Sequence, residues 1–239
     1  MKKIKVSMMS CLVLISIAII SNAQETVTKP APAQSYKAGG IAVAIPSPAT
    51  NMTDVGFGNR KFMEVFVPPD NRLIAGFLLT NDLPKLGKTS DGSILSKYAI
   101  VEVARHMEYM DCSSSDFGKL TAAMKKQFGD VVNSTTKKVE EEFNRRMKSL
   151  DLNKLTVKLE KPVQLGCLFS KQDAYGFGMI MFVSSGGTAT KMGVGSALVR
   201  VKQRVLFLYL YAEYKNEDTV KWLRRATEDW ADAVLKANK

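Results

Sequence analysis

The chain has 239 residues, of which 46% are hydrophobic, and its formal net charge is +11. A chain of this length can bury a full hydrophobic core, so folding requires neither a metal nor a disulfide. His106 is the only histidine, which excludes zinc sites that need two imidazoles from one chain. Any Ser-His-Asp or Cys-His mechanism would have to use His106.

The first 23 residues have the pattern of a cleavable secretory signal peptide. Lys2, Lys3 and Lys5 precede an apolar stretch from Cys11 to Ile20, and a small-residue site ends at Ala23. The apolar stretch is shorter than the roughly 20 residues that a membrane-spanning helix needs. We therefore expect cleavage near Ala23, a periplasmic or secreted protein, and no transmembrane segment in the mature chain.

The mature chain stays basic, because the signal segment contains three lysines and no acid, and its removal lowers the formal charge from +11 to +8. A basic exported protein meets an acidic protein, an anionic polymer or a lipid headgroup far more readily than nucleic acid. Residues 24–40 (QETVTKPAPAQSYKAGG) lack periodicity and are typical of a flexible linker. Residues 41–239 then form a single domain, since no second boundary is visible.

The first half of this domain is expected to contain four strands and then helix. Pro68-Pro69-Asp70 is a turn sequence between the second and third strands. From Phe117 to Leu150 the apolar residues fall three or four apart, which predicts helix with Ser115 or Asp116 as its N-cap. Residues 129–136 are poor helix formers, so one long helix and two shorter helices both fit. The four expected strands are 41–45, 62–67, 73–80 and 97–109.

The second half is expected to contain four more strands and a final helix. Residues 204–214 are apolar on both faces, which predicts a central strand, joined to its predecessor by a tight turn at Lys202-Gln203. The glycine-containing segment 184–196 has the composition of a loop between strands. Residues 217–237 form an amphipathic helix with Asn216 as its cap. The expected strands are 156–165, 176–184, 196–201 and 204–214.

This element order predicts an α+β fold, in which an antiparallel β-sheet of about eight strands is flanked by a long amphipathic helix in the middle of the chain and a C-terminal helix. A long apolar strand, Val205 to Tyr214, runs into a final helix that carries Trp222 and Trp230. In this order and ending the chain resembles the PsbP, Mog1 and DcrB sandwich proteins, although it matches no motif of theirs. The resemblance implies a non-enzymatic accessory or binding domain.

A candidate catalytic group surrounds His106. If residues 97–109 form one strand, then Glu102, His106 and Glu108 share a face, and a carboxylate could orient the imidazole for acid or base catalysis. The competing interpretation is a surface histidine beside surface acids.

Cysteines and basic residues supply the other candidates. Cys112 and Cys167 remain after cleavage, and either one disulfide or two separate thiols fits. The sequence indicates no cofactor and no metal site. A copper(I) site at His106, Met107 and Met110 is disfavoured, because adjacent strand positions face opposite ways. A candidate anion-binding patch, with a solvated helix face as its alternative, consists of Lys125, Lys126, Lys137, Lys138, Arg145 and Arg146.

Three functional hypotheses follow from these observations. The first is an exported, non-enzymatic envelope protein that binds another protein or an anionic envelope component. The second is an envelope enzyme that uses His106 with Glu102 or Glu108 as acid or base. The third is a carrier for an apolar ligand.

Overall fold

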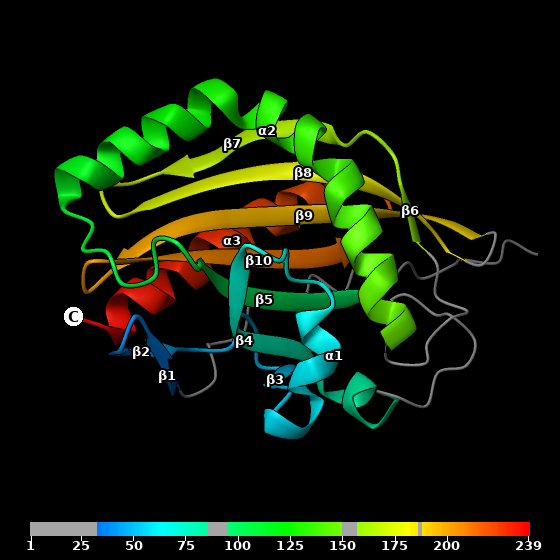
Figure 1. Cartoon of the computed structure of the whole chain (residues 1–239), viewed down its shortest axis with the longest axis horizontal. Coiled ribbons are helices and arrows are strands. Elements are labelled where there is room, and N and C mark those ends of the chain that lie inside the picture. Colours follow the sequence, from blue (N-terminus) through cyan, green and yellow to red (C-terminus); the bar gives the residue numbers. More distant parts are fainter. Residues whose placement is uncertain (1–32, 86–94, 150–156, 186–187) are drawn as a thin grey trace, which may run out of the picture.

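The structure is a computed structural model that describes residues 33–85, 95–149, 157–185 and 188–239 (Figure 1). The expected signal peptide and residues 24–32 of the expected linker lie outside the described residues. None of the helices in the described ranges is long and apolar enough to cross a membrane.

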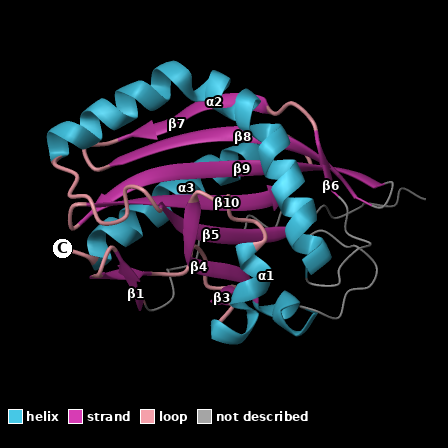
Figure 2. Ribbon diagram, viewed as in Figure 1, coloured by secondary structure: helices cyan, strands magenta, loops and turns pink. Residues whose placement is uncertain are grey.

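An antiparallel sheet of eight strands organises the molecule (Figure 2). Its order is β3, β4, β5, β10, β9 and β8, and both β6 and β7 pair with the outer edge of β8. In Figure 1, α2 lies in front of the sheet and α3 lies behind it. The predicted fold class is confirmed. The strands are β3 (Met52–Asp54), β4 (Asn71–Leu79), β5 (Lys97–Ala104), β6 (Val157–Leu159), β7 (Val163–Ser170), β8 (Ala174–Ser185), β9 (Thr188–Val201) and β10 (Arg204–Glu213).

A second, two-stranded sheet precedes the large one. It pairs β1 (Gln34–Ala38) with β2 (Ile41–Ile45), and Gly39 and Gly40 form the turn with φ values of 54° and 79°. β1 lies within residues 24–40, which are expected to form a flexible linker, and for the residues of β1 that expectation is wrong. The sequence pattern that would indicate this strand is weak, because β1 is short and its only fully buried residue is Ala38.

The predicted strand at residues 62–67 is instead a short helix, α1 (Arg60–Glu64), followed by a turn. Phe62 and Phe66 pack edge to face with their centroids 5.6 Å apart, and Met63 is fully buried. The apolar residues of this segment fit both periods, alternate positions in a strand and positions four apart in a helix, so the pattern alone could not decide. Two short 3-10 helices, η1 (Phe57–Asn59) and η2 (Thr80–Lys85), lie nearby in the chain.

Three other expected boundaries differ from the structure. β5 ends at Ala104, and the following residues form turns in which Met107 N donates to Ala104 O at 3.0 Å. The expected strand 156–165 is two strands, β6 and β7, interrupted before Val163. The expected loop 184–196 is largely strand, because β8 and β9 continue to Ser185 and from Thr188.

β10 is central, as predicted, since it pairs with β5 on one side and β9 on the other. Lys202 and Gln203 form its turn from β9 with φ values of 47° and 65°, the positive angles that a two-residue hairpin requires. On one face of β10, Leu206, Leu208 and Leu210 are buried in the same apolar cluster as Trp230 of the last helix.

The middle of the chain forms one helix rather than two, α2 (Ser114–Ser149), which bends as it crosses in front of the sheet (Figure 1). Its N-cap is Ser113, not Ser115 or Asp116, because Asp116 N donates to Ser113 Oγ at 3.1 Å.

The last helix, α3 (Glu217–Ala237), has the predicted bounds, and Asn216 caps it by accepting a hydrogen bond from Asp218 N at 3.0 Å. α3 lies close against β9 at two glycines. A Cβ on Gly195 would lie 2.1 Å from Thr227 Oγ1, and one on Gly193 would lie 2.6 Å from Leu223 Cδ1. The glycines therefore serve helix–sheet packing rather than a mobile loop.

Candidate functional site

The expected catalytic group is not assembled. Because β5 ends at Ala104, His106 lies on an exposed turn, whereas Glu102 and Glu108 are buried with 2% and 7% of their surface exposed. Each carboxylate has its own partners. Asn71 Nδ2 donates to Glu102 Oε1 at 3.0 Å, and Gly39 N donates to Glu108 Oε1 at the same distance. The strand geometry that would have put the three residues on one face ends too early.

Glu102 is a buried acid whose pKa is strongly raised. Burial raises its pKa to about 7, while hydrogen bonding from Asn71 and Tyr209 lowers the pKa and so opposes the effect of burial. The pKa of Tyr209 is held well above its ordinary value by burial and by the charge of Glu102. Glu102 therefore belongs to a buried polar cluster of the core, away from His106.

Glu108 has a structural role. Arg72 forms a salt bridge to it, with Arg72 Nε 2.9 Å from Glu108 Oε2, and this pairing lowers the pKa of the carboxyl. Arg72 also donates to Lys37 O at 3.0 Å. Glu108 and Arg72 thus tie the turn after β5 to the β1–β2 hairpin.

The two cysteines are separate free thiols. Cys112 is buried beside Phe117 and Phe177, and burial raises the pKa of its thiol. Cys167 is exposed on β7. The sequence is compatible with one disulfide or two separate thiols, and the structure contains two separate thiols.

The six residues of the expected anion patch are spread along α2, and most of those described have partners. Lys125 Nζ lies 3.3 Å from Ser170 Oγ, and Lys126 is exposed. Lys137 Nζ lies 3.9 Å from Glu141 Oε1. The side chain of Lys138 lies outside the described residues.

At the other end of α2 the basic pair shares one acidic partner. Arg145 and Arg146 each approach Glu142 Oε1 to 2.5 Å, and together, Arg145 foremost, they lower the pKa of Glu142 to about 2. Arg146 also donates to the carbonyl oxygens of Glu64 and Val67. Because most of these basic residues have partners within the chain, the structure favours a solvated helix face with local ion pairs over one dedicated anion-binding site.

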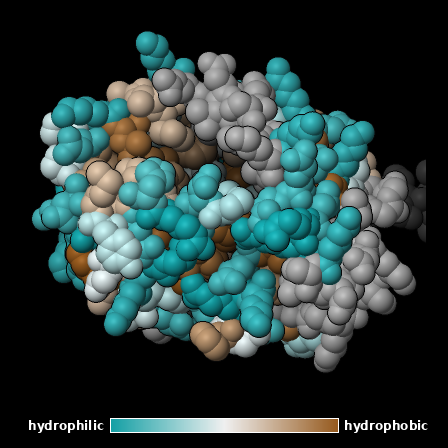
Figure 3. Space-filling view, in the orientation of Figure 1, coloured by the Kyte–Doolittle hydropathy of each residue, from teal (hydrophilic) through white to brown (hydrophobic). Residues whose placement is uncertain are grey.

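The face of the molecule toward α2 is mixed in polarity. In Figure 3, hydrophobic side chains are visible in several small areas between hydrophilic ones. The coloured part of this view therefore shows no single extended apolar patch.

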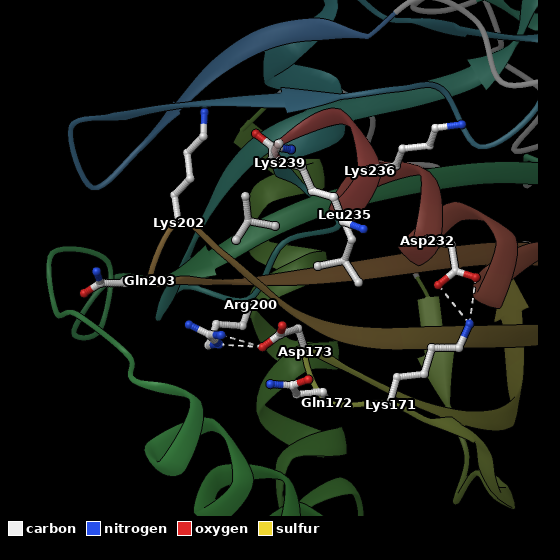
Figure 4. A pocket seen from close by; sticks show the side chains of 12 residues that line it. Lys171, Gln172, Asp173, Arg200, Lys202, Gln203, Asp232, Leu235, Lys236 and Lys239 are labelled. Atoms are coloured by element: carbon white, nitrogen blue, oxygen red, sulfur yellow. Dashed lines mark hydrogen bonds and ion pairs between the residues drawn. The ribbon is translucent and has the colours of Figure 1, made fainter.

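A pocket of about 770 Å³ lies instead at one end of the sheet. Three segments that are far apart in the sequence line it: the β7–β8 turn (171–173), the end of β9 with the β9–β10 turn (200–203), and the end of the chain from Asp232 (Figure 4). We call it the sheet-end pocket. The antiparallel order of β8, β9 and β10 brings the two turns to the same edge of the molecule.

Ion pairs fix two of its basic side chains. Lys171 Nζ lies 2.7 Å from Asp232 Oδ2 and 2.9 Å from Glu228 Oε1, which links the β7–β8 turn to α3. Partial burial lowers the pKa of Lys171, but the two acids raise it above its ordinary value. Arg200 Nε lies 2.7 Å from Asp173 Oδ1. Asp173 and Asp232, the two acidic side chains that line the pocket, are therefore both engaged in ion pairs.

Three further lysines of the pocket have no acidic partner among the described residues. Lys202 Nζ donates to Ala42 O at 3.0 Å, and Lys236 and Lys239 are exposed on the last turn of α3 and beyond it. The apolar residues Val201 and Leu235 also line the pocket. The pocket thus combines some apolar lining with an excess of positive charge, which suits an anionic group.

No local pattern in the sequence indicates this pocket. The Lys202-Gln203 turn and the final helix are predicted correctly, but nothing in the sequence indicates that residues 171–173 lie beside them. Within the described ranges, no cluster of three or more His, Cys, Asp or Glu side chains could hold a metal ion.

The comparisons with known proteins concern the fold. No protein-family model matches the chain, and a comparison with curated proteins found no match. Among solved structures, the Saccharomyces cerevisiae Ran-binding protein Mog1p is 14% identical with a TM-score of 0.31, over 86% of this chain and 92% of that one. Cyanobacterial PsbP (CyanoP) from Synechocystis sp. PCC 6803 is 12% identical with a TM-score of 0.35, over 83% of this chain and 91% of that one. Both come from the group of sandwich proteins that the element order resembles.

Proposed function

We propose that this chain is an exported, non-enzymatic accessory protein of the cell envelope, which binds an anionic group of its partner in the sheet-end pocket. The observation that carries the proposal is the set of three lysines, Lys202, Lys236 and Lys239, which line the pocket without acidic partners among the described residues. The signal-peptide pattern and the basic balance of the mature chain support the setting.

Charge reversal tests the pocket. The probe is a fluorescent peptide of alternating Glu and Ser residues, and its binding to the purified protein is followed by anisotropy at low and high salt. In the double variant Lys236→Glu/Lys239→Glu we expect affinity to fall about tenfold or more, because each reversed charge replaces attraction by repulsion. Binding should also weaken as salt increases.

The matched control is Lys215→Glu/Arg224→Glu, which changes the net charge by the same amount at exposed positions outside the pocket. We expect its affinity to stay within about twofold of the unmodified protein, because at ordinary salt distant surface charges are screened. Equal losses in both double variants would mean that the peptide senses net charge alone, and the pocket proposal would be wrong.

Export is tested separately. Expression of the full chain in a bacterium, followed by fractionation and mass measurement, should recover from the envelope or the medium a protein that begins at Gln24. An uncleaved protein in the cytoplasmic fraction would contradict the proposed setting.

A further inference from the structure

The turn that follows β5 presents two large apolar side chains to solvent. Tyr109 and Met110 have exposed fractions of 74% and 60%, whereas the other large hydrophobic residues exposed in the described ranges, Phe57 and Val163, lie elsewhere and singly. Adjacent exposed aromatic and thioether groups are unusual on a surface without a partner, and Tyr and Met are enriched at protein interfaces. We call residues 105–111 the Tyr109 loop.

Backbone hydrogen bonds hold this loop in place. Arg105 N donates to Asp70 O at 2.9 Å, Met110 N donates to Met107 O at 3.0 Å, and Cys112 N donates to Gln203 O at 2.8 Å. The loop is therefore anchored at both ends, to the start of β4 and to the β9–β10 turn.

Two buried charged side chains add to this anchoring. Arg204, only 8% exposed, donates to Met110 O at 3.2 Å and pairs with Asp111. Glu108 accepts from Gly39 N, where a Cβ would come within 2.0 Å of Glu108 O. Burial of charge is unfavourable unless the groups are paired, so both side chains are committed to the conformation of the loop. A loop that is ordered before binding loses less entropy when it binds.

The Tyr109 loop and the sheet-end pocket lie at the same end of the molecule. Gln203, which accepts the hydrogen bond from Cys112 N, also lines the pocket. In Figure 1 the loop after β5, the β1–β2 hairpin, the β9–β10 turn and the C-terminal end of α3 all meet at the left-hand end. The exposed apolar pair and the lysines without an acidic partner therefore lie at the same end of the molecule.

We propose that the Tyr109 loop and the sheet-end pocket form one docking surface for an acidic protein segment, which packs an apolar side chain against Tyr109 and Met110 while its carboxylates meet the pocket lysines. The second half of this statement rests on the proposed function of the pocket. A protein partner fits better than an anionic membrane, because the pocket is concave and a peptide carboxylate can enter it, whereas a flat surface cannot place its charges inside.

Three synthetic peptides separate the two contributions. The first alternates Glu with Leu and Phe, the second has Ser in place of Leu and Phe, and the third has Lys in place of Glu. We expect the first to bind the purified protein most tightly, the second about tenfold more weakly and the third not measurably. The contrast between the first two peptides reports the apolar contact, because a tenfold change in affinity is about 1.4 kcal/mol, a loss expected when the central anchor residues of an interface are truncated.

The decisive variant is Tyr109→Ser/Met110→Ser, whose exposed positions leave the core untouched. Its affinity for the first peptide should fall about tenfold, and its affinity for the Ser-containing peptide should not change. Phe57→Ser, at a site with 93% exposure elsewhere on the molecule, is the matched control and should bind all peptides as the unmodified protein does.

Each outcome bears on a different statement. If Tyr109→Ser/Met110→Ser binds the first peptide normally, or if Phe57→Ser loses as much, the docking surface is refuted whatever the pocket does. If only the Lys236→Glu/Lys239→Glu variant behaves normally, the pocket proposal fails while the apolar half of the surface stands. Co-sedimentation with phosphatidylglycerol vesicles, together with no binding of the first peptide, would assign the loop to a membrane instead and overturn the inference.

Discussion

α3 packs directly onto its face of the large sheet, whereas the opposite face, toward α2, contains polar groups within its apolar surroundings. Against α3, Gly193 and Gly195 leave room for the helix, and Trp230 Nε1 donates to Pro46 O at 2.8 Å. On the other face lie Glu102 and Tyr209. The largest apolar cluster lies on the α3 side, whereas the α2 side contains a titratable carboxyl whose charge depends on pH.

Removal of the central side chain on the α3 side should have the largest effect. Trp230 is 1% exposed and meets the ring of Phe77 edge to face at 6.0 Å. Trp230→Ala should lower the free energy of unfolding by about 4 kcal/mol, because it leaves a cavity and an unpaired carbonyl. Urea denaturation measures the change. Trp222→Ala, at a partly buried position of the same helix, is the control and should cost clearly less.

The α2 side should respond to pH through Glu102. Its pKa is raised from an ordinary value of 4.5 to about 7 in the folded protein, so the folded state holds the proton more tightly than the unfolded state does. The stabilising contribution is complete below pH 4.5 and is lost as the pH rises toward 7 and above, by roughly 3 kcal/mol at most.

The variant Glu102→Gln tests this assignment, because the amide stays neutral at every pH. Stability measured from pH 4 to pH 8 should fall less steeply in the variant than in the unmodified protein, with the variant relatively more stable at the alkaline end. Parallel stability curves would mean that Glu102 is not the group that titrates.

Substitution of a single glycine should disrupt the close packing of α3 against the sheet. In Gly195→Ala the new Cβ would lie 2.1 Å from Thr227 Oγ1, so the helix or the threonine must move. We expect a loss of about 2 kcal/mol in unfolding free energy, in the range found for overpacked cores. Gly118→Ala on α2 meets nothing within 4 Å and should be neutral or slightly stabilising. Similar losses at both positions would contradict the packing argument.

The same comparison explains what could be predicted from the sequence. α3 and β10 were placed almost to the residue, because a cap at Asn216 and an unbroken apolar strand are local signals. For Gly193 and Gly195 the sequence predicts a loop, because glycine lowers strand propensity. The structural reason for these glycines is the close approach of α3, which is distant in the sequence.

The candidate site shows a similar division. The Lys202-Gln203 turn was predicted, since a two-residue hairpin turn is encoded locally. Its neighbours in the pocket, Lys171 and Asp232, are brought together only by the order of the strands and the docking of α3. His106 and Glu102 were grouped on the assumption of a continuous strand, and the end of β5 at Ala104 separates them.

The smallest expected effect comes from removal of two buried hydroxyl groups, one on each face of the sheet. Ser196 Oγ and Thr227 Oγ1 have no hydrogen-bond partner among the described residues, and the two residues are 1% and 0% exposed. Replacement of an unpaired buried hydroxyl by an apolar group removes a desolvation penalty, so Ser196→Ala and Thr227→Val should each be neutral or stabilising by about 1 kcal/mol. Thr227→Val keeps the shape that α3 needs against Gly195, whereas Ser196→Ala deletes one atom beside Tyr209. If either variant loses more than about 1 kcal/mol in urea denaturation, its hydroxyl is paired in solution, and a buried water is the partner to look for.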